Sequence, residues 1–171
     1  MAFVVETGSG SATANSYLSV ADADTYHTDH GDSSDWSGST EAQKQEALRL
    51  ATQYLDAKYD GRWKGTRSNE DQALDHPRTG IVDSDGYIYD SDALAQCLLD
   101  ATAELARRVR EGDTLLDDIG RPGIFKSKRV KVGPIDTTKV YVGGGSQVKT
   151  YPLIERLLSH LITDNTMVYR G

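Results

Sequence analysis

The sequence of 171 residues contains a single cysteine, Cys97, so no disulfide can form within the chain and we expect a reducing compartment. Cys97 falls on the apolar side of an expected helix, where a small buried residue is more common than a nucleophile. No apolar run approaches the roughly 20 residues that cross a bilayer. The first residues also lack the basic start and long apolar segment of a signal peptide. These absences predict a protein without membrane contact that stays where it is made.

Positive charge is missing from the first 40 residues, which have no lysine or arginine but contain Glu6, Asp22, Asp24, Asp29, Asp32 and Asp35. The net charge of −7 argues against a protein that coats nucleic acid with its whole surface. Residues 121–131 show the opposite imbalance, because they contain no acid but carry Arg121, Lys126, Lys128, Arg129 and Lys131. The chain is therefore acidic near one end and locally basic near the other.

Apolar residues recur with helical spacing in three segments, 20–29, 40–59 and 91–111. The strongest pattern is in 40–59, which Thr40 and Gln43 open as a capping box. Its expected buried face consists of Ala47, Leu48, Ala51, Tyr54, Leu55 and Tyr59. For 91–111 we expect caps from Ser91 and Asp92 and a buried stripe of Leu94, Cys97, Leu98, Ala101, Leu105 and Val109. The three segments predict a small helical core.

Two polar stretches predict little regular structure. Residues 1–18 begin with a strand-like arm and continue as a Gly/Ser run that is typical of a flexible segment. In an oligomer this arm would dock on a neighbouring subunit. Residues 31–38 are expected to form a polar loop that contains Trp36.

Residues 60–90 show no helical period, although they connect two expected helices. Glycine or proline occurs every few residues, at Gly61, Gly65, Pro77, Gly80 and Gly86, which predicts a succession of turns. A connection of about thirty residues inside a compact domain is usually functional or disordered. Order is favoured by apolar and aromatic anchors that a solvated linker lacks: Trp63, Leu74, Ile81, Val82, Tyr87, Ile88 and Tyr89. We therefore expect an ordered loop pinned onto the helices.

From 124 to 142 the period changes to two, which predicts a protruding β-hairpin turning at Gly133 and Pro134. Neither face is cleanly apolar, and a lone two-stranded hairpin is marginal in water, so we expect it to lean on a surface such as a neighbouring subunit. The candidate residues for contact with a partner or with phosphates are Lys126, Lys128, Arg129 and Lys131. A solvated ribbon explains this charge about equally well. Single-strand binding also needs stacking aromatics, and only Phe125 and Tyr141 are near.

A glycine-rich linker follows, and a final helix is expected to begin at Thr150 with Pro152 in its first turn. This candidate assembly helix is too apolar for solvent, because it carries Leu153, Ile154, Leu157, Leu158 and Leu161. The predicted fold class is mainly α (α+β), a small helical bundle with a long ordered interhelical loop. Its parts are an arm (1–18), a helical core with the loop 60–90 (19–120), the hairpin and linker (121–149), and the C-terminal helix and tail (150–171).

Two near-matches to ligand-binding motifs are better explained without the ligand. Residues 143–150 end in Lys-Thr like a P-loop, but Val148 occupies a position that must be glycine, so a flexible linker is preferred. His27, Asp29 and His30 are too few for a metal centre, and a solvated helix end is preferred.

A third near-match is the group Asp83, Asp85 and Asp90 around Gly86, which misses the spacing of a calcium loop and is more simply an Asp-Gly turn. Sequence order alone does not assemble a Ser–His–Asp or Cys–His arrangement. We predict a protein that is not an enzyme and uses no cofactor or metal.

The loop also carries residues that resemble a family of small tailed-bacteriophage proteins. They are Trp63, Gly65, Arg67, Gln72, Ala73, Leu74, Pro77, Arg78, Gly80, Asp85 and Gly86. Members are often described as DnaT-like single-stranded-DNA-binding proteins, and their relatives resemble head–tail adaptor, or head-completion, proteins. The resemblance spans residues 16–106. The chain departs from the family pattern at 75–76, where an aromatic usually precedes Pro-Arg, and at 92–94, where Ile-Pro usually opens the next helix.

The resemblance implies a structural virion protein. A head–tail adaptor forms a ring of about a dozen subunits below the portal, extends the DNA channel and connects head to tail. The implied partners are further copies of the chain, the portal protein, a tail-side neck or tail-terminator protein, and double-stranded DNA that passes through the lumen without sequence recognition. The implied location is the virion neck, after assembly in the host cytoplasm. A negative lumen would let DNA slide without sticking.

Two other hypotheses remain open at this point. A phage single-stranded-DNA-binding protein of the primosome type predicts salt-sensitive oligonucleotide binding that depends on Lys128, Arg129 and Lys131. A nucleotide-dependent enzyme would require Lys149 for hydrolysis, and we expect no such activity.

Overall fold

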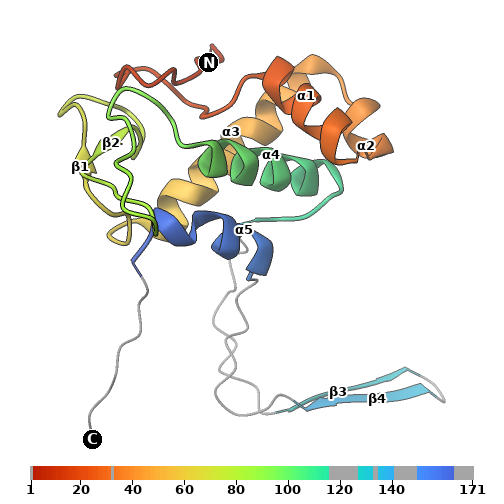
Figure 1. The fold of residues 1–171 in the computed structure, drawn as a ribbon. Helices are drawn as coiled ribbons and strands as arrows, with labels where there is room; N and C mark the ends of the chain where they lie inside the picture. The colour runs from red at the N-terminus through yellow and green to blue at the C-terminus, as the bar shows by residue number, and fades with distance from the viewer. Residues whose placement is uncertain (1, 32, 116–126, 133–134, 141–149, 164–171) are drawn as a thin grey trace, which may run out of the picture. The chain divides into compact units, whose positions relative to one another are not determined.

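The computed structural model describes residues 2–31, 33–115, 127–132, 135–140 and 150–163, and it is mainly helical (Figure 1). The chain divides into two compact units, residues 1–115 with 151–171, and residues 116–150. We call the first the helical unit and the second the hairpin unit. Within the described ranges, no helix has the length and apolar character needed to cross a membrane. The predicted mainly helical fold class is confirmed.

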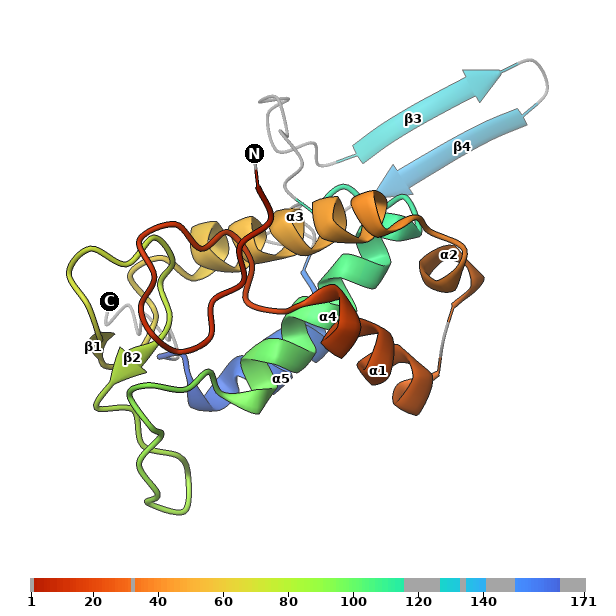
Figure 2. The ribbon, with the colours of Figure 1, turned by 90° about the horizontal axis from the view of Figure 1, so that it is seen from above.

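The helical unit is built around two long helices that lie against each other (Figure 2). Helix α3 shares its largest helix–helix contact with α4, α1 lies against both, and α5 packs along α4. The helices are α1 (Val20–His30), α2 (Ser34–Ser37), α3 (Glu41–Tyr59), α4 (Gln96–Arg110) and α5 (Pro152–Leu157), which continues as a 3-10 turn, Leu158–His160.

The apolar faces of α3 and α4 form most of the core. Thr40 and Gln43 make the predicted capping box at the start of α3, and all six residues of its predicted buried face are buried. In α4, Leu98, Ala101 and Leu105 are fully buried, whereas Cys97 and Val109 of the predicted stripe are half-buried and Leu94 lies before the helix. The helical period therefore identified the core face of α3 and part of the core face of α4, where Thr102, Ala103 and Ala106 are also buried.

Helix α4 begins later than predicted. Its N-cap is Ala95, which makes no side-chain capping bond, and not Ser91 or Asp92. The segment before it is occupied by contacts with other parts of the chain. Ser68 Oγ donates to the Ser91 carbonyl at 2.7 Å, and a Cβ on Gly8 would lie 2.0 Å from the Asp92 carbonyl oxygen. The prediction was wrong because these long-range contacts outweigh the local capping preference.

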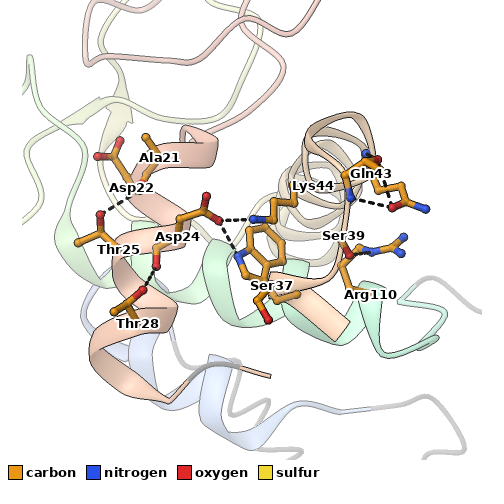
Figure 3. A network of polar contacts seen from close by, with 12 residues as sticks. Ala21, Asp22, Asp24, Thr25, Thr28, Ser37, Ser39, Gln43, Lys44 and Arg110 are labelled. Atoms are coloured by element: carbon orange, nitrogen blue, oxygen red, sulfur yellow. Dashed lines mark hydrogen bonds and ion pairs between the residues drawn. The ribbon is translucent and has the colours of Figure 1, made fainter. Parts of the chain in front are cut away.

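The expected polar loop 31–38 contains a helical turn, α2, and its tryptophan belongs to the core. Trp36 is 1% exposed and packs 4.7 Å from the His27 ring. Its indole Nε1 donates to Asp24 Oδ1 at 2.8 Å, and Lys44 Nζ pairs with the same oxygen at 2.8 Å (Figure 3). Asp24 thus links α1, α2 and α3.

The N-terminal Gly/Ser run is folded around a buried carboxylate, so the prediction of a flexible segment was wrong. Glu6 is 2% exposed, and Val5 forms a parallel bridge with Ser16. The Glu6 carboxylate accepts the backbone N–H groups of Gly8 (2.9 Å), Gly10 (3.0 Å) and Ser11 (2.7 Å). Its oxygens satisfy three amides that would otherwise need water, and this fixes the loop.

The C-terminal helix is shorter than predicted and packs on the core. Tyr151 is its N-cap, so Thr150 does not cap it, and Pro152 takes the first helical position. Ile154, Leu158 and Leu161 are fully buried, whereas Leu153 is 46% exposed and Leu157 is half-buried.

The hairpin unit contains the predicted antiparallel ribbon. Strand β3 (Ser127–Val132) pairs with β4 (Ile135–Val140), with Ser127 opposite Val140 and Val132 opposite Ile135. Lys128, Arg129 and Lys131 belong to β3, whereas Lys126 and the linker 141–149, which holds most of the P-loop-like sequence, lie outside the described residues.

Candidate functional site

The loop 60–90 is ordered, as predicted, and is the candidate site that the sequence singled out. Strand β1 (Thr66–Arg67) pairs with β2 (Arg78–Thr79), and Trp63 forms an antiparallel bridge with Ile162 near the C-terminal helix. Trp63 and Ile81 are buried, and Leu74 and Tyr89 pack against the core. Val82, Tyr87 and Ile88, also predicted to be anchors, are exposed instead.

Arg78 holds the turns of the loop together through their backbone. Its guanidinium donates to the carbonyl oxygens of Lys64 (2.8 Å), Gly65 (2.8 Å) and Asp75 (3.2 Å). Such a fork of fixed donors suits three converging acceptors, which a lysine ammonium would not reach together. The Arg78 side chain therefore has a scaffolding role in the loop.

Gln72, another residue of the family resemblance, also holds the loop together through its backbone. It is 3% exposed, and its Nε2 donates to the carbonyls of Leu74 (2.7 Å) and Pro77 (3.1 Å). Its Oε1 accepts the Asn69 amide at 2.9 Å, and Arg67 donates to the Gln72 carbonyl at 3.3 Å.

Gly65 is required by close backbone packing as well as by its conformation. Its φ is +69°, and a Cβ there would lie 2.2 Å from the Thr79 carbonyl oxygen. The motif residues Gly65, Arg67 and Arg78 thus explain how the loop folds.

We expect Arg78→Met to lower the free energy of unfolding by about 2–4 kcal/mol, because three carbonyls lose a charged donor. Urea denaturation of the purified chain measures this change. The matched control is Arg156→Met, which removes an exposed arginine of α5 and should change stability by less than about 0.5 kcal/mol. Equal effects of the two substitutions would contradict the scaffolding role of Arg78.

A buried polar cluster joins this loop to α3 and the N-terminal segment. The Tyr17 hydroxyl donates to Asp56 Oδ1 and accepts the His76 amide N–H at 3.2 Å. The Asp75 amide donates to Asp56 Oδ2 at 3.4 Å. The His76 ring packs edge-on against Trp63, with ring centroids 4.6 Å apart. The His76–Pro77 peptide bond is cis.

Burial changes the protonation of this cluster. It raises the pKa of Asp56 to about 7, even though the Tyr17 hydroxyl bond acts in the opposite direction. Burial, with a smaller contribution from Arg78, lowers the pKa of His76 to about 3, so its ring is neutral at physiological pH. Burial and the Asp56 carboxyl also raise the pKa of Tyr17 well above its usual value. These bonds join the loop to α3, and we assign the cluster a structural role.

The far end of the loop is a tight turn over residues 82–88. Val82 bridges Ile88, the Asp83 amide donates to the Tyr87 carbonyl at 2.9 Å, and Gly86 has a φ of +90°. Asp83 Oδ1 accepts the amides of Asp85 (2.9 Å) and Tyr87 (2.8 Å). The carboxylate of Asp83 thus binds backbone amides, which supports the Asp-Gly turn over a calcium loop.

The candidate metal ligands of α1 are directed to different environments. His27 is buried, whereas His30 is exposed and stacks on Tyr26, with ring centroids 4.2 Å apart. In the part of the chain that the structure describes, no three His, Cys, Asp or Glu side chains are grouped to hold a metal ion.

Sequence reasoning missed Glu6, Tyr17 and Asp56. Glu6 and Tyr17 are buried and Asp56 is half-buried, and their hydrogen bonds involve irregular segments of the chain, so no periodic pattern marks these residues. A cue for Glu6 was available, since an acid immediately before a Gly/Ser run can accept several exposed amides.

The structure defines a class of protein with two units. One is a compact helical unit with an ordered loop between α3 and α4, and the other is a β-hairpin unit that lies between α4 and α5 in the sequence. The family described as "Putative DnaT-like ssDNA binding protein" matches residues 1–171, and the chain belongs to this family. No curated protein and no solved structure matches the chain.

Proposed function

We propose that the protein is a structural component of a tailed-phage virion, a head–tail adaptor that forms a ring below the portal. The observation that carries the proposal is the hairpin unit, which the chain forms between α4 and α5. An isolated two-stranded hairpin is marginal in water, so it requires a surface to pack on. A neighbouring copy supplies that surface in a ring.

The charge distribution supports contact between unlike surfaces. The chain carries a net charge of −7, while residues 121–131 have no acid. A basic hairpin and an acidic helical unit attract each other when they belong to neighbouring copies. The repulsion between an acidic ring and DNA also suits a channel through which DNA slides.

A second candidate function is binding of single-stranded DNA, which the description of the family favours. The basic residues Lys128, Arg129 and Lys131 of β3 would provide the phosphate contacts. This function predicts affinity for oligonucleotides that falls steeply with salt.

Replacing residues 121–149 by a short Gly-Ser linker separates the two candidates. We expect the intact chain to assemble into a ring of about a dozen copies, measured by native mass spectrometry, and the shortened chain to stay monomeric. Triple replacement of Lys128, Arg129 and Lys131 by alanine should weaken assembly. The control replaces Lys58 and Arg156, cations of the helical unit, by alanine.

The same samples are titrated with a fluorescent oligonucleotide at several salt concentrations. Strong, salt-sensitive binding by a monomer, lost in the triple variant and kept in the control, would support the DNA-binding candidate and overturn the adaptor. Counting the chain against the major capsid protein in purified virions gives an independent test, since an adaptor is present at about a dozen copies per particle.

A further inference from the structure

The 82–88 turn displays apolar side chains on a rigid support. Val82, Tyr87 and Ile88 are 43%, 73% and 74% exposed, the last two more than any other large apolar side chain of the described residues. The backbone hydrogen bonds between Asp83, Gly86 and Tyr87, together with the bonds that the Asp83 carboxylate accepts, hold the turn in one shape. A pre-shaped apolar protrusion loses little conformational entropy on binding, which favours its use as a contact.

A groove with complementary properties lies elsewhere on the same helical unit. It has a volume of about 460 Å³ and lies between the N-terminal segment, α3 and the loop. Ala14, Ala57 and Leu74 provide apolar lining, and Arg49 adds a cation. The rest of the lining is polar: Asn15, Thr52, Gln53 and Asp56. The groove is open to solvent, and its volume falls within the range of about 300–1,000 Å³ that is typical of small-molecule sites.

One residue of the turn and one residue of the groove have opposite charges. Asp85 is exposed beside Tyr87 on the turn, and Arg49 is half-buried at the groove. In Figure 2 the turn projects from the helices on the side away from α3, whose flank forms a wall of the groove. One molecule therefore does not fill its own groove with its own turn.

We propose that the 82–88 turn of one copy inserts into the Arg49–Leu74 groove of the next copy. Tyr87 and Ile88 occupy the apolar lining, and Asp85 pairs with Arg49. The two surfaces differ, so the contact is heterologous, and its repetition builds a ring or a filament. The inference rests on the proposed self-assembly and names the contact that produces it.

Truncation of the turn tests the apolar part. In the full-length chain, Tyr87→Ala with Ile88→Ala should weaken self-association at least about tenfold in sedimentation velocity, as expected for central interface residues. Leu50→Ala is the control, because Leu50 is 41% exposed and does not line the groove. Circular dichroism should show that all three chains are folded, since the replaced side chains are exposed.

Charge reversal tests the pairing directly. Asp85→Arg and Arg49→Asp should each weaken assembly, because each variant alone places like charges at every contact. In an equimolar mixture every contact between unlike chains carries opposite charges, one pair native and the other reversed. Assemblies in which the two variants alternate are therefore expected, and a mixture that assembles no better than either variant alone would overturn the contact.

Cysteine pairing locates the contact independently. In a Cys97→Ala background, chains with Ile88→Cys are mixed with chains with Ala57→Cys and oxidised, and mass spectrometry should identify the 88–57 disulfide between chains. If the parent chain assembles but this cross-link does not form, the proposed contact is overturned while the proposed ring is not. A parent chain that stays monomeric at all concentrations would overturn both.

Discussion

Glu6→Ala should lower the free energy of unfolding by about 3–5 kcal/mol, one of the largest effects of any single substitution in this chain. The substitution leaves the amides of Gly8, Gly10 and Ser11 without their acceptor in a site where Glu6 is 2% exposed. It also releases the segment that contacts the long loop, because Asn69 Nδ2 donates to the Gly10 carbonyl at 3.1 Å. Urea denaturation followed by circular dichroism measures the change.

Two further variants show whether the carboxylate itself is responsible. Glu6→Gln should cost about 1–2 kcal/mol, since one amide oxygen still accepts backbone donors while its NH₂ group faces another donor. Glu46→Ala, at an exposed position of α3, should change stability by less than about 0.5 kcal/mol. If Glu6→Ala were as mild as Glu46→Ala, the N-terminal loop would not depend on its buried acid.

The second large effect is a change in how stability depends on pH. Asp56 has a pKa of about 7 in the folded chain against a usual 3.8, so between these values the folded state holds a proton that the unfolded state has lost. His76 has a pKa of about 3 against a usual 6.5, so here the unfolded state holds the extra proton. The two contributions have opposite signs and cancel between about pH 4 and 6.5.

Replacing either Asp56 or His76 should reveal the pH dependence of stability that the remaining group contributes. Asp56→Asn leaves His76, and stability should then rise by about 1.4 kcal/mol per pH unit relative to the parent as pH increases from 4 to 6.5. His76→Phe leaves Asp56, and stability should fall at a similar rate over the same range. Urea denaturation at half-unit intervals of pH gives both slopes.

The double variant Asp56→Asn with His76→Phe is the control and should return to the pH dependence of the parent. Parallel pH profiles for both single variants and the parent would show that neither group has a perturbed pKa. Opposite slopes would confirm that burial sets both protonation states, because burial disfavours the charged form of each group.

The helical part of the fold followed from the sequence because its signal is periodic. The buried face of α3 and its capping box were predicted residue by residue, and the β3–β4 hairpin followed from alternation. The start of α4 was misjudged because Ser91 and Asp92 are good local caps. Contacts with the loop and the N-terminal segment hold them outside the helix.

The loop was only partly predictable for a similar reason. Its order followed from its aromatic content, and Trp63 and Ile81 are buried as expected. Hydrophobicity alone did not distinguish these anchors from Tyr87 and Ile88, which extend into solvent. Trp36 was misjudged in the opposite direction, because its polar neighbours in the sequence predicted a loop position although it is a core residue. The indole nitrogen of Trp36 donates to Asp24 and fixes the ring in the core.

The position of α5 has a consequence for synthesis on the ribosome. Ile154, Leu158 and Leu161 complete the core, and the Lys64 amide donates to the Leu161 carbonyl at 2.9 Å. These residues are translated after the hairpin, so a nascent chain that ends at Leu115 lacks part of its core. The hairpin therefore leaves the ribosomal exit tunnel before the helical unit of the same chain can complete its core.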